Sequence, residues 1–210
     1  EMLPAVKAQG IAKFCDIFCE KGVFSIDQGR RLLTAAKDFG LGAKIHADEV
    51  HDLGGAGLAA DIKAVSADHL LAAGRDNIRA MAESGGVGVL LPATAYSLKK
   101  PYARARMMIE NKLPVALATD CNPGSSFCES MPFVFGLAVM VMNMTPSEAL
   151  TGATLNAAYA VGMAARTGSL DLSKQADFIL LDGLSPAILA YHAGVPPVAD
   201  VYKNGSRVQT

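Results

Sequence analysis

The chain has 210 residues, which is enough to bury a sizeable core in one or two domains. Hydrophobic residues make up 51% of it and aromatic residues only 6%, so we expect helices of alanine, leucine and methionine over buried parallel strands. The formal net charge is -1 with no basic run, which excludes the electrostatic signature of a nucleic-acid-binding protein or of a protein on anionic membranes.

Cysteine usage and apolar runs indicate where the protein works. The four cysteines show no Cys-x-x-Cys spacing, so reduced thiols in the cytoplasm are expected. No uninterrupted apolar run reaches the ~20 residues that a membrane span needs, and we expect no membrane association. Because Glu1 precedes Met2 and the opening residues are already typical of a helix, the chain is expected to begin partway through a larger protein.

Strands and helices alternate over the first 120 residues. The pattern predicts strands over residues 14–18, 43–46, 64–69, 87–91 and 114–120, and helices over residues 25–39, 58–62, 75–83 and 101–111. Ser25 and Gln28 form a capping box for the first of these helices. Strand ends recur about every 25 residues, as in βα units of a parallel sheet or a (β/α)8 barrel, and five strands are three fewer than a closed barrel has. The residues after Pro92 are interpreted as a polar loop.

The pattern changes after the fifth strand. Helices are predicted over residues 131–143 and 154–166, with a second capping box at Thr145 and Glu148. Short strands follow at residues 176–182 and 198–202, before an Asn-Gly turn. We therefore predict a boundary near Gly168, with residues 1–168 as part of the barrel and residues 169–210 as a separate small sheet.

Imidazoles and carboxylates stand where the predicted strands end. His46 and Glu49 follow the second strand, His69 ends the third and Asp120 ends the fifth. Loops at the carboxyl ends of parallel strands converge on one crevice, and a hydrolytic metal centre takes imidazole and carboxylate ligands there. The set is incomplete, because the sequence holds no His-x-His or His-x-x-x-His pair.

Two further histidines are weaker candidates for a site. His51 lies five residues after His46 in a loop, and His192 lies in the C-terminal segment. For the stronger candidates structural roles stay open: His46 and His69 could be hydrogen-bonded core histidines, and Asp120 could be a helix N-cap. Asn122 and Ser125 could simply form a turn.

Several segments resemble the imidazolonepropionase family of the metal-dependent amidohydrolase superfamily. The similar segments, which run over essentially the whole chain, are Ile-His-Ala-Asp-Glu at 45–49, Ala-Asp-His-Leu at 67–70, Leu-Leu-Pro at 90–92, Ala-Thr-Asp-x-Asn-Pro-Gly-Ser-Ser at 118–126 and Asn-Ala-Ala-Tyr-Ala-Val-Gly at 156–162. The first and fourth are specific to that family, whereas Ala-Asp-Phe-Ile-Leu-Leu-Asp at 176–182 marks the superfamily.

The resemblance implies a fold, a reaction and partners. It implies a (β/α)8 barrel, here about strands four to eight, with the C-terminal strands of a small β-sandwich. The implied reaction is hydrolysis of 4-imidazolone-5-propanoate to N-formimidoyl-L-glutamate in histidine degradation, with one zinc or iron ion. It further implies that the full-length enzyme is a homodimer.

The resemblance also implies roles for single residues. His46 and Asp120 would be metal ligands, and Asp120 would also move protons. Glu49 would contact the substrate and transfer protons, and His69 would polarise the carbonyl or help to activate water. Asn122, Gly124 and Ser125 would line the substrate pocket.

The chain departs from the family pattern at the other ligands. In the family a His-x-His pair from the N-terminal half completes the metal site, and these 210 residues do not contain it. We therefore expect this polypeptide alone to be inactive. Alternatives are another amidohydrolase, such as a cytosine or guanine deaminase, and a non-catalytic half-barrel.

Overall fold

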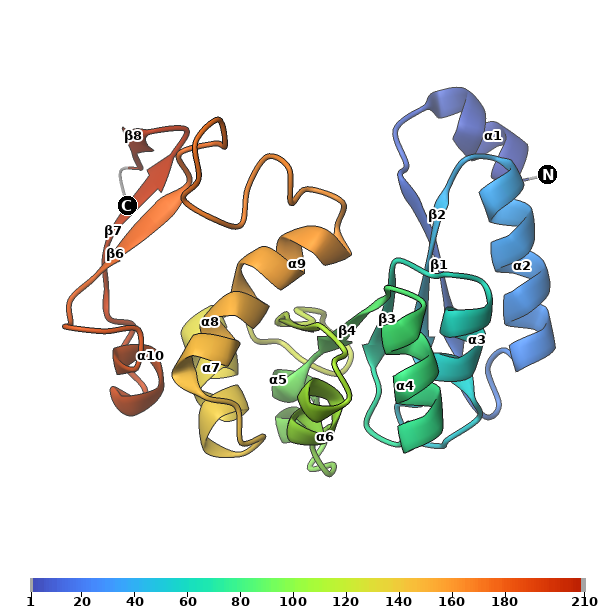
Figure 1. Cartoon of the computed structure of the whole chain (residues 1–210), viewed down its shortest axis with the longest axis horizontal. Coiled ribbons are helices and arrows are strands. Elements are labelled where there is room, and N and C mark those ends of the chain that lie inside the picture. The colour runs from blue at the N-terminus through green and yellow to red at the C-terminus, as the bar shows by residue number, and fades with distance from the viewer. Residues whose placement is uncertain (1, 209–210) are drawn as a thin grey trace. The chain divides into compact units, whose positions relative to one another are not determined.

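Four parallel strands and their connecting helices form the first of two units in the chain (Figure 1). The computed structural model describes residues 2–208. The first unit runs to Leu90 and also takes in Met107–Pro114, and the second comprises Leu91–Arg106 and the chain from Val115 onward.

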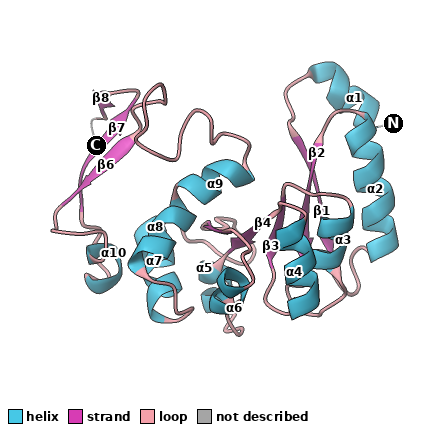
Figure 2. Cartoon of the chain, viewed as in Figure 1, coloured by secondary structure: helices cyan, strands magenta, loops and turns pink. Residues whose placement is uncertain are grey.

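The first unit confirms the predicted alternation of strands and helices. Its strands are β1 (Phe14–Cys19), β2 (Gly42–Ala47), β3 (Ser66–His69) and β4 (Val87–Leu90), paired in that order and all parallel. Its helices are α1 (Met2–Gln9), α2 (Ile26–Asp38), α3 (Gly55–Asp61) and α4 (Arg75–Glu83), which lie beside the strands (Figure 2). The helix α6 (Ala105–Glu110) spans the sequence boundary between the units.

The strands of this unit have two different faces. Along β2, Ala43, Ile45 and Ala47 are buried, whereas Lys44 and His46 are half-buried, because successive side chains point to opposite faces. The helices α2 and α3 pack against β2. They therefore cover the alanine and isoleucine face, and His46 lies on the other face.

The helix α2 shows how the sequence determines this packing. The predicted capping box is confirmed, because the Ser25 hydroxyl accepts from the Gln28 backbone N–H at 3.2 Å and the Gln28 side chain accepts from the Ser25 N–H at 2.9 Å. Gly29, Leu33 and Ala36 are its buried residues, at helical spacing. A Cβ on Gly29 would lie 2.6 Å from Cys19 Sγ, so only glycine allows this close packing on β1.

The second unit contains most of the remaining elements. These are α5 (Pro92–Ser97), β5 (Val115–Leu117), α7 (Met131–Met140), α8 (Pro146–Ala153), α9 (Leu155–Ala160), β6 (Phe178–Leu181), α10 (Ile188–Tyr191), β7 (Val198–Lys203) and β8 (Ser206–Arg207). The last three strands form an antiparallel sheet in the order β6-β7-β8. The predicted short C-terminal strands are thus confirmed, while their membership of a β-sandwich and the boundary at Gly168 stay predictions.

The interpretation of the segment after β4 as a polar loop was wrong. Residues 92–97 form α5, and its residues Pro92, Ala93, Thr94 and Ala95 are buried. Pro92 is its first helical residue, a position where proline is favoured. The proline signal was instead assigned to Pro101, but α6 begins only at Ala105.

The helix predicted over residues 154–166 is shorter in the structure. Gly162 adopts φ 67°, its N–H donates to Tyr159 O at 3.0 Å, and the Met163 N–H donates to Ala158 O at 2.7 Å. This is the hydrogen-bond pattern of a Schellman motif, which ends α9 at Ala160. The four-residue helix α10 was not predicted. Within residues 2–208 there is no helix with the length and apolarity to cross a membrane.

Candidate metal and catalytic site

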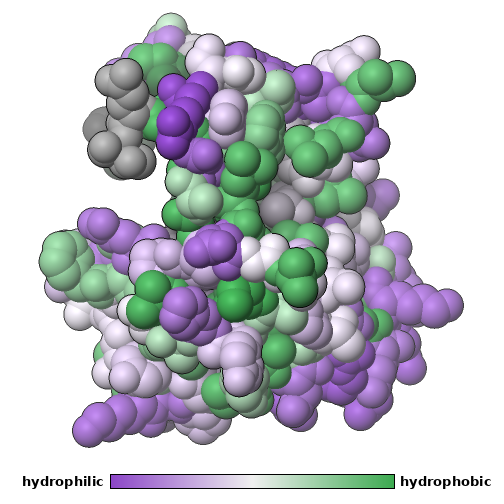
Figure 3. Space-filling model, turned by 90° about the vertical axis from the view of Figure 1, so that its left-hand side faces the viewer, coloured by the Kyte–Doolittle hydropathy of each residue, from purple (hydrophilic) through white to green (hydrophobic). Residues whose placement is uncertain are grey.

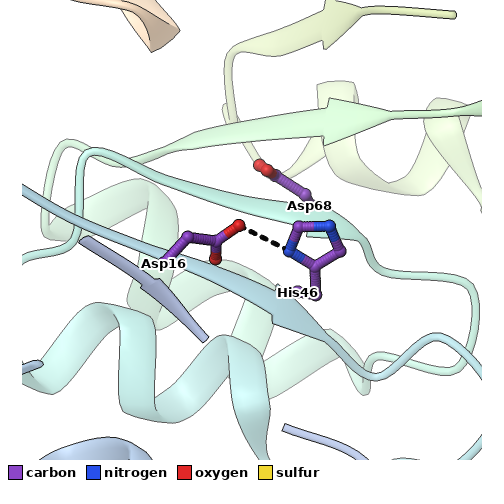
Figure 4. A group of neighbouring side chains, drawn as sticks. All are labelled: Asp16, His46 and Asp68. Atoms are coloured by element: carbon purple, nitrogen blue, oxygen red, sulfur yellow. Dashed lines mark ion pairs between the residues drawn. The ribbon is translucent and has the colours of Figure 1, made fainter. Parts of the chain in front are cut away.

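Asp16, His46 and Asp68 share one face of three neighbouring strands. The register pairs Asp16 with Lys44, and His46 with Asp68. Because side chains alternate along a strand, His46 lies on the same face as Lys44, two residues before it. The topology thus places one imidazole between two carboxylates (Figure 4).

The donor atoms of these three residues are close enough to share a cation. They all lie within 4.8 Å of one another, and His46 Nδ1 is 2.8 Å from Asp16 Oδ2. The dashed line in Figure 4 marks this pair. Imidazole nitrogen with carboxylate oxygen is a donor set that suits zinc or iron. This face of the strands therefore fits a divalent metal.

Asp68 is the buried member of the group. Its side chain accepts from the Ser66 hydroxyl at 2.7 Å, and its carboxylate is 3.8 Å from Lys44 Nζ. Burial raises the pKa of Asp68 above its ordinary value, although Lys44 and the Ser66 hydroxyl oppose that rise. Among the neighbouring groups, Lys44 therefore does most to stabilise the negative charge of Asp68.

His69 and Glu49 lie close to His46, as expected for residues at the ends of neighbouring parallel strands. The ring centroids of His46 and His69 are 5.3 Å apart, and Glu49 Oε1 is 3.8 Å from His69 Nδ1. His69 is buried and its φ is 74°, a left-handed conformation that is uncommon for a residue other than glycine. The structure thus brings together three of the predicted site residues.

Glu49 belongs to a segment, here named the β2 loop (residues 48–54), that is fixed by buried carboxylates. Asp48 is fully buried and accepts from the backbone N–H groups of Leu53, Gly55 and Ala56 at 2.8–3.0 Å. Burial raises the pKa of Asp48, against the effect of these hydrogen bonds. Asp48 thereby ties the residue before Glu49 to the start of α3.

Glu20 fixes the other side of the same loop. This residue is 6% exposed and accepts from the N–H groups of Val50 at 2.9 Å and His51 at 3.2 Å. His51 Nδ1 also lies 2.8 Å from Glu20 Oε1. Burial alone would raise the pKa of Glu20, but hydrogen bonds from Val50, Lys21 and His51 outweigh it and lower the pKa. His51 is thus bound to Glu20 and has a structural role in the β2 loop.

Asp120 stands in the second unit, with Thr94 as its partner. The Thr94 hydroxyl donates to Asp120 Oδ2 at 2.5 Å, and Thr94 is 2% exposed. Asp120 has φ 54°, again left-handed. The next helix, α7, begins at Met131 with Ser130 as N-cap, so the alternative role of Asp120 as a helix N-cap is wrong.

Asn122 organises the segment that follows, here named the β5 loop (residues 118–126). Its Oδ1 accepts from the N–H groups of Gly124 at 2.8 Å and Ser125 at 2.7 Å. Its Nδ2 donates to Asp120 O at 2.7 Å and to Ser125 Oγ at 3.1 Å. This is the hydrogen bonding of an Asx turn. The amide of Asn122 therefore has a structural task, and substrate contacts by these three residues stay a prediction.

The second unit also has an apolar cavity of about 360 Å³. Its lining comes from α7, α10 and the residues next to them, including His192. Figure 3, which views the side of the C-terminal elements, shows hydrophobic residues gathered in the middle of that face. The walls offer few polar groups, so we assign no chemistry to this cavity.

Sequence reasoning missed four residues that shape the site. Asp16 interrupts an otherwise apolar strand, and that interruption was a usable signal. Glu20 acts through partners up to 31 residues away, and no sequence signal pointed to it. Asp48 stands in the segment Ile-His-Ala-Asp-Glu but was given no role, and its partners lie 5 to 8 residues away. Thr94 lies in a segment that was interpreted as a loop.

The sequence of the chain is similar to that of one known family. The profile of the amidohydrolase family matches residues 28–208. Imidazolonepropionases of Desulfotalea psychrophila and Syntrophobacter fumaroxidans are 71% and 63% identical to the chain over 99% and 98% of its length. The matches take in 50% and 49% of those proteins, so the chain spans about half the length of the curated relatives it matches.

Solved structures support the fold. An adenosine deaminase from Xanthomonas campestris with bound zinc aligns with a TM-score of 0.79 and 19% identity, over 98% of this chain and 54% of that one. An atrazine chlorohydrolase variant from Arthrobacter aurescens in complex with zinc aligns with a TM-score of 0.73 and 17% identity, over 91% and 49%. The parallel strands and helices of this chain therefore match part of an amidohydrolase barrel.

Proposed function

Because this chain belongs to the amidohydrolase family, we propose that it supplies the C-terminal half of an imidazolonepropionase. This metal-dependent hydrolase opens the ring of 4-imidazolone-5-propanoate to N-formimidoyl-L-glutamate in histidine degradation. The single observation that carries the proposal is the grouping of His46, Glu49 and His69 at the ends of β2 and β3. The 71% identity to a curated imidazolonepropionase supports this substrate over a nucleobase.

In this proposal His46 and Asp120 hold one zinc or iron ion. The imidazole and carboxylate donors suit either metal. When bound, such an ion supplies Lewis acidity, which polarises a carbonyl and makes water a stronger nucleophile at neutral pH. The remaining ligands come from the part of the enzyme that this chain does not contain.

The residues of the chain perform the proton transfers. Ring hydrolysis joins a water oxygen to the ring carbonyl carbon, breaks the ring C–N bond and moves a proton from that water to the departing nitrogen. Glu49 accepts this proton and delivers it, with Asp120 as the second carboxylate available for transfer. His69 donates a hydrogen bond to the carbonyl oxygen, where negative charge develops.

The second loop completes the pocket in this proposal. Asn122 shapes the β5 loop, and the backbone of Gly124 and the hydroxyl of Ser125 contact the substrate. We further propose a cytoplasmic enzyme, supported by the free thiols of Cys15, Cys19, Cys121 and Cys128. A homodimer of the full-length enzyme stays an expectation from the family.

The test is a chimera that restores the missing half. The N-terminal half of the Desulfotalea psychrophila relative is joined to this chain, and hydrolysis of 4-imidazolone-5-propanoate is measured by loss of its ultraviolet absorbance. We expect turnover by the chimera and none by the 210-residue chain alone. Turnover of cytosine or guanine in place of the imidazolone would favour the deaminase alternative.

Two variants of the chimera examine the assigned roles. Glu49→Gln removes a proton carrier and keeps the side-chain shape, so we expect kcat to fall by about 10²–10⁴-fold. His192→Gln is the matched control, because His192 lines the apolar cavity of the second unit. A chimera that binds metal and turns over no substrate of any of these classes would support the non-catalytic half-barrel.

A further inference from the structure

Asp16 is the one charged residue of the otherwise apolar strand β1. The other residues of β1 are phenylalanine, cysteine and isoleucine. Asp16 lies on the same face as His46, with Oδ2 at 2.8 Å from His46 Nδ1 (Figure 4). We propose that Asp16 is a positioning residue that holds the His46 ring in one tautomer and one orientation for metal binding. This inference rests on the proposed function, in which His46 is a metal ligand.

The chemistry of the imidazole ring defines the effect. A neutral imidazole carries one proton, on either Nδ1 or Nε2. A carboxylate can only accept at Nδ1, so Asp16 keeps the proton on Nδ1 and leaves the Nε2 lone pair as the metal donor. Carboxylate–histidine–metal arrangements of this kind fix the ring and raise the basicity of the ligand.

Asp68 is less suited to this task, although it also lies near His46. Its Oδ1 accepts from the Ser66 hydroxyl at 2.7 Å and is 3.8 Å from Lys44 Nζ. Asp68 is thus tied to Ser66 and Lys44. The side chain of Asp16 is 37% exposed and forms an ion pair with His46 at 2.8 Å. Asp16 is therefore the carboxylate that aligns the ring.

The ring is also supported from its sides. The Phe18 ring meets the His46 ring edge-on, with centroids 5.9 Å apart, and the His69 ring lies 5.3 Å from it. Phe18 and Asp16 come from the same face of β1, two residues apart. One face of β1 thus supplies both the packing and the hydrogen-bond acceptor that orient His46.

Nuclear magnetic resonance of histidine-labelled chain tests the tautomer directly. The sequence has four histidines, so ring nitrogen signals are assigned with single His→Gln variants. We expect His46 as the Nδ1–H tautomer in the wild-type chain. Asp16→Ala should give a mixture of tautomers, and Asp16→Asn should also lose the single preference, because its amide can accept from Nδ1–H or donate to an unprotonated Nδ1. An Nε2–H tautomer in the wild-type chain would overturn the inference.

Zinc affinity of the chimera provides the second readout. We expect Asp16→Ala to weaken zinc binding by about 10–100-fold, and Asp16→Asn to weaken it less. Asp76→Ala is the control for loss of one charge, because Asp76 is exposed on α4 and pairs with Arg79. If zinc instead displaced the proton from His46 Nδ1, and Asp68→Asn weakened zinc binding as much as Asp16→Ala, Asp16 would be a direct ligand and the inference would be wrong.

These readouts separate this inference from the proposed function. The tautomer of His46 is measured without metal or substrate. A chimera without turnover would refute the proposed function and leave the tautomer result standing. An active chimera whose His46 carries its proton on Nε2 would refute only the role of Asp16.

Discussion

The β2 loop and the β5 loop each follow a buried strand and carry predicted site residues, but different interactions hold them. In the β2 loop, Asp48 and Glu20 accept backbone N–H bonds from residues that are 5 to 31 positions away in the sequence. In the β5 loop, Asn122 bonds to residues only two or three positions away. The backbone of the first loop is thus held in part by Glu20, which lies 30 residues before it, whereas the backbone of the second is held by the local Asn122 turn, and its distant partner Thr94 contacts only the Asp120 side chain.

This difference indicates how each loop should respond to mutation. A buried carboxylate that satisfies several backbone donors leaves all of them unsatisfied when it is removed, which costs much free energy. A local turn loses fewer constraints, because its groups are near water and can find other partners. Substitutions at Asp48, Glu20 and Asn122 test this contrast, and a change of pH tests an ion pair elsewhere in the second unit.

Asp48→Ala should have the largest effect on stability. The substitution removes the acceptor for three backbone N–H groups, of Leu53, Gly55 and Ala56, two of them in buried hydrogen bonds. We expect the free energy of unfolding to fall by about 3 kcal/mol. Urea unfolding monitored by circular dichroism measures it. A loss below about 1 kcal/mol would contradict the view that the Asp48 carboxylate fixes the β2 loop through these three hydrogen bonds.

Glu20→Gln should cause the next largest loss of stability. The amide keeps one acceptor oxygen but places an NH₂ group against backbone N–H donors of Val50 or Lys21. We expect a loss of about 2 kcal/mol by the same unfolding measurement.

The matched control for that change is Glu110→Gln, because Glu110 is exposed in the first unit. Surface substitutions of this kind change stability by about 0.5 kcal/mol or less. Equal losses in the Glu20 and Glu110 variants would show that Glu20 has no special role in holding the β2 loop.

Asn122→Ala should have a smaller and local effect. We expect about 1 kcal/mol, together with faster hydrogen exchange at the amides of Gly124 and Ser125, which bond to Asn122 Oδ1. Asn122→Asp keeps this acceptor and should keep the amides protected. Changes in exchange that spread through the second unit would argue against a self-contained loop.

Acid should weaken the second unit slightly. Arg106 hydrogen-bonds both carboxylate oxygens of Glu148, and this interaction lowers the pKa of Glu148 from its ordinary 4.5 to about 2. A carboxylate with a lower pKa in the folded state stabilises the fold above its unfolded pKa and loses that contribution as pH falls toward the folded value.

The pair is partly exposed, so solvent screening limits the contribution to about 1 kcal/mol, lost between about pH 4.5 and pH 2. Thermal unfolding across this pH range measures the loss, and Glu148→Gln should remove it. If stability still fell with pH in that variant, a group other than Glu148 would be responsible.

Local signals made much of the fold predictable from the sequence. The capping boxes at Ser25 and Thr145 are present as predicted, and α4 has the predicted bounds. Strand ends were predictable because apolar runs stop at polar residues such as His46 and His69. The helix α5 was not, because six residues are too few to show a helical period, and Pro92 was interpreted as the end of a strand and not as the start of a helix.

The site was predictable only in part, for a related reason. His46 and His69 lie at the ends of β2 and β3 and Glu49 lies two residues after β2, so their meeting follows from the topology of a parallel sheet. Asp16 meets His46 through the strand register, and Glu20 bonds to residues 30 and 31 positions away, neither of which one sequence reveals. The partners of Asp48 lie 5 to 8 residues away, but no local pattern showed that its side chain is buried.

The metal content of the chimera tests the central claim most directly. We predict one zinc or iron ion per chimera, lost in His46→Ala and in Asp120→Ala and kept in His192→Ala, as measured by inductively coupled plasma mass spectrometry after gel filtration. Full metal content in the His46 and Asp120 variants, with the protein folded by circular dichroism, would contradict the account.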